Sequence, residues 1–220
     1  MIQVLISFVF VFALLVSIRN NKIEFDSAIF FGFGYLLHCG LRDINVGEDS
    51  INYFNNYFLT ANKYNSILEF FSSSDVFFRF VNYLLLLFSN NWYYYSSAMA
   101  LICLILVLKI NKSYFNSNKT YFYTALIITN PVFIENTTNI LRSSLCCLIV
   151  FLGYLSYDKN KTKGIIITTL GFLTHYFQGV LILCVFVLSK FNLIRTSKHH
   201  RIFTLGVLIV LFVKTFTSIL

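Results

Sequence analysis

Eight apolar runs separated by short polar gaps constrain this chain more than any other feature of its sequence. Of its 220 residues, 57% are hydrophobic and only 12% are charged, whereas an ordinary soluble domain carries about 25% charged residues. So few charges cannot cover a water-facing surface of this size, and so many apolar residues argue against a disordered chain. The runs occupy residues 2–18, 28–41, 76–88, 92–110, 121–134, 140–157, 165–188 and 202–220.

Several of these runs, with their flanks, approach the roughly 20 residues that a helix needs to cross a bilayer. We therefore predict an all-α, polytopic integral membrane bundle of about eight apolar segments, with residues 1–220 as one domain and lipid as its main surroundings. The first run is followed by Arg19 without a cleavage site of small residues, which favours a retained helix. The last run continues to Leu220 without a polar tail, so we expect a shortened version of a longer protein. The aromatic residues 92–95 are typical of a belt at the membrane interface.

The excess of 17 Lys and Arg over 9 Asp and Glu lies in gaps between runs rather than in a groove with aromatic side chains, so no nucleic-acid partner is expected. Basic gaps usually face the cytoplasm, but eight simple crossings would put two of the four gaps on the other side. All four would face the cytoplasm if residues 76–88 were a re-entrant or short segment and residues 165–188 a bent hairpin with His175 at its outer tip. The alternative is that the charge rule fails here. The basic gaps are residues 19–22, 109–119, 159–163 and 190–201.

On this topology an external polar loop at about residues 42–75, a second segment at 130–142 and the tip at His175 share one side of the membrane. Pro131 should end the preceding helix near Thr129, because a proline ring clashes with the carbonyl four residues back. The ionisable residues on that side are compatible with a single pocket. They are Arg42, Asp49, Arg142 and His175.

Each candidate also has a plain structural alternative. The guanidinium of Arg142 offers a rigid fork of donors that suits phosphate, but an arginine near a helix end can also reach for the bilayer surface. His175 could accept a proton or contact a phosphate, or it could simply bond to a neighbouring helix. Gly47 permits a sharp turn, after which Asp49 and Tyr53 would share one helix face; Asp49 could alternatively cap that helix.

The five cysteines lie within apolar runs and show neither C-x-x-C spacing nor spacing with histidine that suits a metal. We therefore expect them to be buried as small apolar residues, and we predict neither a metal nor another cofactor.

The sequence around Arg42, Arg142 and His175 resembles that of the EpsG-type exopolysaccharide polymerases, relatives of the Wzy O-antigen polymerases. The first element of that family, Arg-x-x-x-x-Gly-x-Asp-x-x-x-Tyr, is matched by Arg42, Gly47, Asp49 and Tyr53. The second, Asn-x-x-Arg at the opening of a helix, is matched by Asn139 and Arg142. The third, similar to Phe-His-x-Ser, departs here, since Thr174 precedes His175 and Tyr176 follows it. The family's acidic-Pro pair ahead of the third run is absent, and Glu69 stands near that place without a proline.

The resemblance implies a multi-pass polymerase of the bacterial cytoplasmic (inner) membrane. Such an enzyme joins oligosaccharide repeat units, carried on polyprenyl diphosphate, during synthesis of capsule, exopolysaccharide or the O-antigen of lipopolysaccharide. It also implies a chain-length regulator and a flippase as further partners. A flippase or transporter of lipid-linked sugars is an alternative, although the sequence shows no internal symmetry, and a truncated, non-catalytic membrane partner is another.

The resemblance also suggests roles for the matched residues. Arg142 and Arg42 would bind the diphosphate, and either His175 or Asp49 would take the proton from the attacking hydroxyl. Tyr53, Asn139 and Gly47 would support them.

Overall fold

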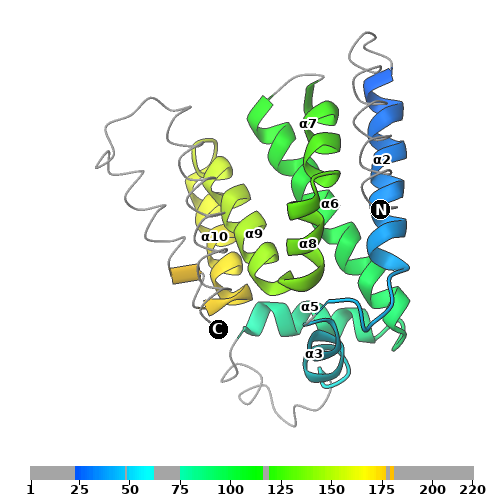
Figure 1. The fold of residues 1–220 in the computed structure, drawn as a ribbon. Helices are drawn as coiled ribbons and strands as arrows, with labels where there is room; N and C mark the ends of the chain where they lie inside the picture. The colour runs from blue at the N-terminus through cyan, green and yellow to red at the C-terminus, as the bar shows by residue number, and fades with distance from the viewer. Residues whose placement is uncertain (1–22, 48, 62–74, 116–118, 177–178, 181–220) are drawn as a thin grey trace.

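The structure, a computed structural model, describes residues 23–47, 49–61, 75–115, 119–176 and 179–180 (Figure 1). These residues form helices joined by loops, as the all-α prediction requires. The apolar runs 2–18 and 202–220, and most of the second half of run 165–188, lie outside the described residues. The elements are α2 (Ile23–Gly40), α3 (Ser50–Asn52), the π-helix η1 (Tyr53–Phe58), α5 (Val76–Leu86), α6 (Trp92–Phe115), α7 (Lys119–Ile128), α8 (Pro131–Asn139), α9 (Leu141–Tyr157) and α10 (Lys161–Thr174).

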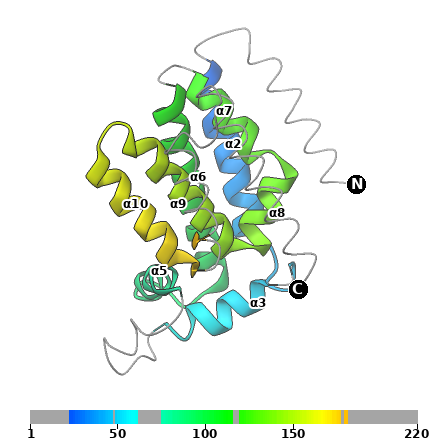
Figure 2. The ribbon, with the colours of Figure 1, turned by 90° about the vertical axis from the view of Figure 1, so that its left-hand side faces the viewer.

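The longer helices stand side by side in a bundle, and α5 lies across its lower end (Figure 1). A view turned by 90° shows α5 nearly end-on at the same level (Figure 2). The chain direction alternates, since α6 rises, α7 and α8 descend in succession, α9 rises and α10 descends. Consequently α2, α8 and α10 end, and α9 begins, at the same end of the bundle.

By length and apolar composition, α6 is the one helix in the described part of the chain that could cross a membrane alone. The pair α8 and α9 passes the same test only as a single broken span, because the two helices are bent by 113° relative to each other. Of the roughly eight predicted segments, the described residues therefore supply one clear span and a second, bent one.

The segment predicted to be re-entrant or short is short. Residues 76–86 form the single 11-residue helix α5. The sharp change of direction occurs instead at Ile140, whose backbone angles (φ −119°, ψ 47°) are not helical and separate α8 from α9.

The break predicted at Pro131 is confirmed. Helix α7 ends at Ile128, and Pro131 occupies the first position of α8, where a helix needs no backbone N–H. The side chain of Asn130 accepts a hydrogen bond from the Val132 N–H at 2.9 Å and so caps the new helix.

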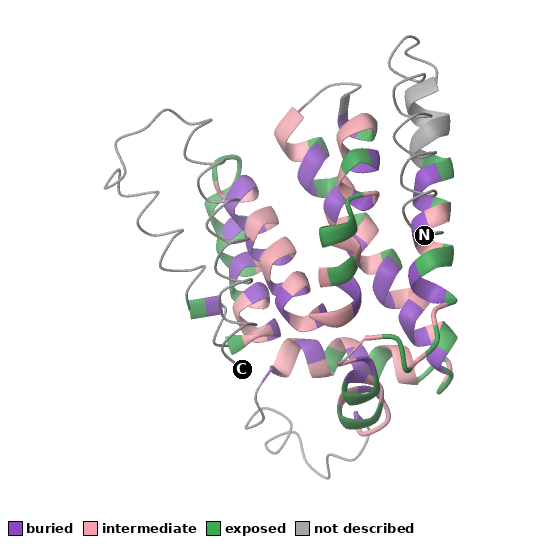
Figure 3. Cartoon of the chain, in the orientation of Figure 1, coloured by how far each residue is buried: buried purple, intermediate pink, exposed green. Residues whose placement is uncertain are grey.

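Helices α9 and α10 pack closely because small residues line their contact. A Cβ atom added at Gly164 would overlap the backbone of Tyr157, and one added at Gly171 would overlap Val150. Figure 3 shows buried residues at intervals along this part of the bundle. Such small residues let two helix backbones approach closely. The contact fixes where α10 ends, and therefore where His175 lies, relative to the start of α9.

Aromatic side chains fill the core at the end of the bundle where α5 lies. Phe58, Phe78 and Tyr95 are almost completely buried there, together with Tyr53 and Trp92. The aromatic residues 92–95 are thus not simply a belt at the membrane interface. Trp92 and Tyr95 face the protein interior, and Tyr93 is half exposed.

Candidate functional site

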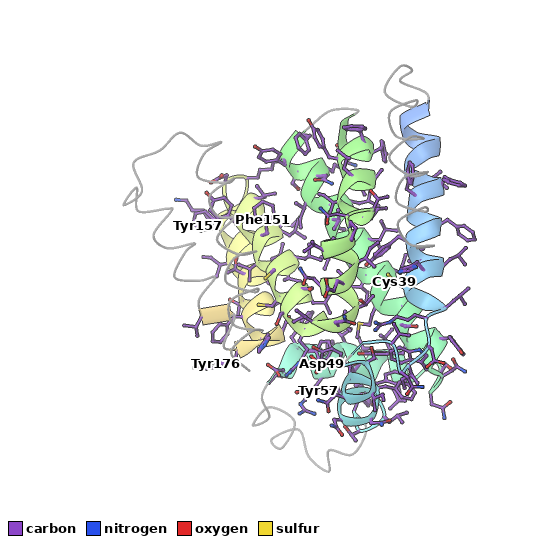
Figure 4. The ribbon with its side chains drawn as sticks, viewed as in Figure 1. Cys39, Asp49, Tyr57, Phe151, Tyr157 and Tyr176 are labelled. Carbon is purple, nitrogen blue, oxygen red and sulfur yellow. The ribbon has the colours of Figure 1, made fainter. Side chains whose placement is uncertain are left out.

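The candidate residues gather where α9 begins and α10 ends. In Figure 4 the labelled Asp49, Tyr57 and Tyr176 lie toward this lower end of the bundle, whereas Phe151 and Tyr157 lie higher. The site therefore combines the loop after α2, the π-helix η1, the start of α5 and the adjoining ends of three bundle helices.

Arg142 is held inside the protein, on the first turn of α9. Its Nη1 donates to the Tyr57 hydroxyl at 2.6 Å and to Asp75 Oδ2 at 2.5 Å. Its guanidinium lies 4.7 Å from the centre of the Tyr57 ring and 5.7 Å from that of Tyr53, within the range of cation–π contacts. The side chain is 25% exposed, so this arginine is directed into a protein site rather than toward the bilayer surface.

Asp75 joins Arg142 to His175. Its carboxylate is only 5% exposed, and its Oδ1 lies 3.7 Å from His175 Nδ1 while accepting the Tyr176 N–H at 3.3 Å. Asp75 directly precedes α5, yet its side chain makes no capping hydrogen bond to that helix. Its φ of 60° falls in the left-handed region, which aspartate tolerates better than most residues do.

His175 follows the last residue of α10 and has extended backbone angles. Its carbonyl lies 3.8 Å from Cys146 Sγ, which donates to it from α9. Burial lowers the pKa of His175 below its usual value; the carboxylate of Asp75 opposes that shift, and the charge of Arg142 adds to it. The imidazole is consequently neutral at pH 7 and able to accept a proton.

Arg42 binds the loop that follows α2 to the end of α8. It donates to the carbonyls of Val46 at 3.1 Å and Thr138 at 2.8 Å, and to Asn139 Oδ1 at 3.4 Å. Its guanidinium lies over the ring of Trp92, whose Nε1 donates to the Arg42 carbonyl at 2.9 Å. Burial lowers the pKa of Arg42, but a guanidinium remains charged in proteins.

Gly47 and Asn139 touch, which brings the first two sequence elements together. Gly47 has a φ of 104°, and a Cβ atom there would overlap Asn139 Oδ1, so only glycine fits this turn. Both the conformation and the close approach therefore require the glycine that the motif contains.

Asp49 precedes α3, but it makes no side-chain capping bond, so the capping interpretation is wrong. Its Oδ2 instead accepts the Tyr53 hydroxyl at 3.5 Å, on the shared helix face that the spacing predicts. Burial, and then the charge of Asp49, raise the pKa of Tyr53 to about 12, so its hydroxyl keeps its proton and can donate.

Tyr53 connects the two arginine clusters. Its ring faces Arg142, and it also lines a small cavity beside Arg42 that has room for about one water molecule. The Tyr95 hydroxyl and Arg42 Nε are buried near this cavity and find no hydrogen-bond partner among the described residues. The sequence elements at residues 42–53, 139–142 and 175 thus form one continuous region.

Sequence reasoning did not nominate Asp75 or Tyr57 as site residues. The guanidinium of Arg79 lies 4.7 Å from the centre of the Tyr57 ring, so this ring contacts two arginines. An available signal was the position of Asp75, an acidic residue directly before an apolar run and four residues before Arg79. The family's acidic position was sought at Glu69, which lies outside the described residues.

These groups can bind an anion and accept a proton close to each other. Nη1 of Arg142 is engaged by Asp75 and Tyr57, and its guanidinium also faces Tyr53. The N-terminus of α9, which has no side-chain cap, adds partial positive charge beside it. Within the described residues, no three His, Cys, Asp or Glu side chains are grouped to hold a metal ion.

Comparison with known proteins shows that the model of the EpsG family matches the chain over residues 26–220. No curated protein and no solved structure matches the chain. The family is one of membrane proteins associated with exopolysaccharide synthesis, in keeping with the apolar helix α6. Because the match covers far more than half of the sequence, including every candidate site residue, this chain belongs to the EpsG family.

Proposed function

We propose that the protein is a polysaccharide polymerase that joins oligosaccharide repeat units carried on polyprenyl diphosphate. The observation that carries this proposal is the arrangement of Arg142 and His175 on either side of the Asp75 carboxylate. A cation suited to phosphate and a neutral imidazole suited to accept a proton lie together at one end of an apolar helical bundle. Transfer of a glycan from a diphosphate to a hydroxyl needs these two groups.

In the proposed reaction, a hydroxyl of the acceptor repeat unit attacks the anomeric carbon of the donor glycan. The bond from that carbon to the diphosphate oxygen breaks, and its electron pair leaves with polyprenyl diphosphate. Arg142 stabilises the negative charge of this leaving group through charge-assisted hydrogen bonds, supported by the N-terminus of α9. The grooves between apolar helices hold the prenyl tail.

His175 is the base that we propose for the hydroxyl proton. Burial keeps its imidazole neutral, whereas the carboxylate of Asp49, the other candidate, accepts a hydrogen bond from Tyr53. For Arg42 we propose a secondary role in phosphate binding, because three of its hydrogen bonds already go to protein acceptors. Gly47, Asn139 and Tyr53 support these groups through the contacts described above.

The proposal includes a multi-pass arrangement in the bacterial cytoplasmic membrane, with the site on the outer side. Exposed lysines lie at the opposite end of the bundle from the site, with Lys159 in the loop after α9 and Lys161 and Lys163 in the first turn of α10. Exposed Lys112, in the last turn of α6, lies at that same opposite end. This separation follows the preference of basic residues for the cytoplasmic side.

The function can be tested in cells that depend on this chain for polymer. Arg142→Ala and His175→Ala should each lower polymer synthesis by on the order of 10²-fold or more, because each removes a group needed in the transition state. Lys112→Ala serves as the control, since it removes a positive charge at the opposite end of the bundle. Polymer is measured by chain length on gels, and the amount of each variant in the membrane is measured by immunoblotting.

The lipid-linked intermediates decide between the polymerase and the alternative functions. A polymerase defect should leave single repeat units on the outer leaflet, where they can be purified and added back to the wild-type protein in proteoliposomes. Accumulation on the inner leaflet would instead favour a flippase. Polymer of normal length and amount from both site variants would remove the catalytic assignment.

A further inference from the structure

We propose that Asp75 is a positioning residue, which holds the His175 imidazole with its Nδ1–H toward the carboxylate and leaves Nε2 to accept the proton of the acceptor hydroxyl. This inference rests on the proposed function and assigns a role to a residue that the sequence elements do not include. The backbone of Asp75 is unusual, because this residue has a positive φ and precedes a helix that its side chain does not cap.

The backbone of Asp75 is held in a conformation that costs free energy. A left-handed residue other than glycine is typically strained by about 1–3 kcal/mol, although less so for aspartate. The usual compensation at this position, a capping bond from the side chain to the first turn of α5, is not made. The carboxylate is instead directed to α9 and to the end of α10, so its contacts there must favour the observed conformation.

The two carboxylate oxygens have separate partners. Oδ2 accepts Arg142 Nη1, whereas Oδ1 faces His175 Nδ1 at 3.7 Å and accepts the backbone N–H of Tyr176 at 3.3 Å. The distance to His175 exceeds that of a hydrogen bond, but such catalytic contacts are often long without substrate and shorten during reaction. Because a carboxylate only accepts, a hydrogen bond between Asp75 Oδ1 and His175 Nδ1 requires the proton on Nδ1, which leaves Nε2 with its lone pair.

Backbone contacts fix His175 on both sides of this interaction. The Tyr176 N–H is bound by Asp75, and the His175 carbonyl accepts from Cys146 Sγ on α9. These contacts fix the backbone from which the imidazole projects, and so keep its Cβ close to the carboxylate.

The other charged and titratable groups that surround Asp75 and His175 are few among the described residues. Arg142 faces the carboxylate from α9, Tyr53 and Tyr57 face Arg142 from η1, and Arg79 approaches Tyr57 from α5. Arg142 disfavours an imidazolium at His175, and Asp75 favours it. Asp75 thus supplies the negative charge that stabilises the imidazolium formed when Nε2 takes the proton.

The proton balance of the step is simple. The acceptor hydroxyl loses its proton to His175 Nε2 as its oxygen bonds to the anomeric carbon and the diphosphate departs. The imidazolium keeps its Nδ1–H directed at Asp75 and returns its extra proton to solvent before the next transfer. Asp75 takes no proton in this step, so it acts through His175 and does not touch the reacting atoms.

The tautomer of His175 can be tested without any activity. We suggest recording nitrogen NMR spectra of the intact chain in lipid nanodiscs with ¹⁵N-labelled histidine, using His175→Gln to assign the signal among the four histidines. In the wild-type protein we expect the neutral ring to carry its proton on Nδ1, and Asp75→Asn should lower the pKa of His175. Glu135→Gln, which removes a carboxylate from an exposed position on α8, should leave both unchanged.

Activity then tests the consequence. Asp75→Asn should slow polymer synthesis at neutral pH by about tenfold or more, because each pKa unit of lost stabilisation corresponds to a factor of ten. The acid limb of its pH–rate profile should move to lower pH, and Asp75→Glu should restore part of the rate. A purely structural role would lower the rate without moving that limb.

The outcomes separate this inference from the proposed function. A wild-type His175 that carries its proton on Nε2 overturns the positioning role, whether or not Asp75→Asn folds. The positioning role is also overturned if the acid limb of the pH–rate profile of Asp75→Asn lies at the same pH as that of the wild-type protein. If the tautomer is as expected but wild-type protein makes no polymer from purified repeat units, the positioning geometry stands and the proposed function fails.

Discussion

Arg42 and Arg142 are both half-buried guanidinium groups, but they use their donors differently. Arg42 donates to two backbone carbonyls and one amide oxygen, all neutral, which hold the loop after α2 against α8. Arg142 faces a carboxylate and a phenol through a single nitrogen. Arg42 is therefore suited mainly to holding the fold, with at most a secondary role in phosphate binding, whereas Arg142 is suited to binding the ligand.

This difference predicts opposite effects for two identical substitutions. Arg42→Lys should lower the free energy of unfolding by about 1–2 kcal/mol, because a lysine cannot reproduce the fork of hydrogen bonds. Arg142→Lys should change stability less but lower polymer synthesis by about tenfold or more. Each variant is the control for the other. Stability is measured by thermal unfolding in detergent, and activity by polymer yield. If both variants lost stability and activity to the same extent, the assignment would be wrong.

The turn at Gly47 gives a second prediction for a single residue. Gly47→Ala should lower stability by about 1–3 kcal/mol, because an alanine is strained at a φ of 104° and its Cβ would overlap Asn139. Gly32→Ala in α2 is the matched control, since its Cβ would meet only the end of the Leu104 side chain at 3.4 Å. We expect the unfolding temperature to fall for the first variant and to stay level or rise for the second. The opposite order would mean that the turn is not as described.

The lowered pKa of His175 predicts how stability responds to acid. When a histidine has a lower pKa in the folded state, the unfolded chain binds a proton first as the pH falls through about 6.5, and the folded state loses relative stability. Between about pH 7.5 and 5.5 the unfolding temperature should fall more for wild-type protein than for His175→Gln. A wild-type protein that became more stable over this range would show that attraction to Asp75 outweighs burial.

At the scale of the elements, the sequence predicts breaks that have a chemical marker. Pro131 marks the end of α7 because proline cannot continue that helix, and the structure confirms this break. The larger bend, at Ile140, has no such marker, because isoleucine neither lacks an N–H nor favours a turn. The contacts of the residues on either side hold it, with Asn139 against Arg42 and Arg142 against Asp75. These partners are 97 and 67 positions away in sequence, so no local pattern contains them.

The contact between α9 and α10 gives a prediction for a pair of elements. Gly171→Leu should push α10 away from Val150, lower stability by about 1–3 kcal/mol and reduce polymer synthesis, because His175 lies only four residues further on. Thr169→Leu, on the exposed side of the same helix, adds similar bulk away from the contact. If both variants behaved like wild type in thermal unfolding and polymer assays, close packing of α10 would not be what positions His175.

At the scale of the whole molecule, the sequence indicated which residues would share one side, and less about how they interact. The topology inferred from the basic gaps put Arg42, Asp49, Arg142 and His175 on one side, and the structure brings all four to one end of the bundle. The connecting carboxylate of Asp75 was not nominated, because its role depends on a left-handed turn and on two partners far away in sequence. The sequence elements indicated which residues lie at one end of the bundle, whereas the contacts between distant elements need the fold.

The same separation of charge predicts the orientation of the whole bundle in a membrane. Lys112 and Lys161 are exposed at one end, and Asn55, in η1, is exposed at the end that carries the site. In cells, Lys112→Cys and Lys161→Cys should therefore react with a membrane-impermeant maleimide only after lysis, whereas Asn55→Cys should react in intact cells. Wild-type protein, treated in parallel, measures the background from its native cysteines. Labelling of all three positions from outside would place the basic loops and the site on one side, which an α6 that spans the bilayer does not permit.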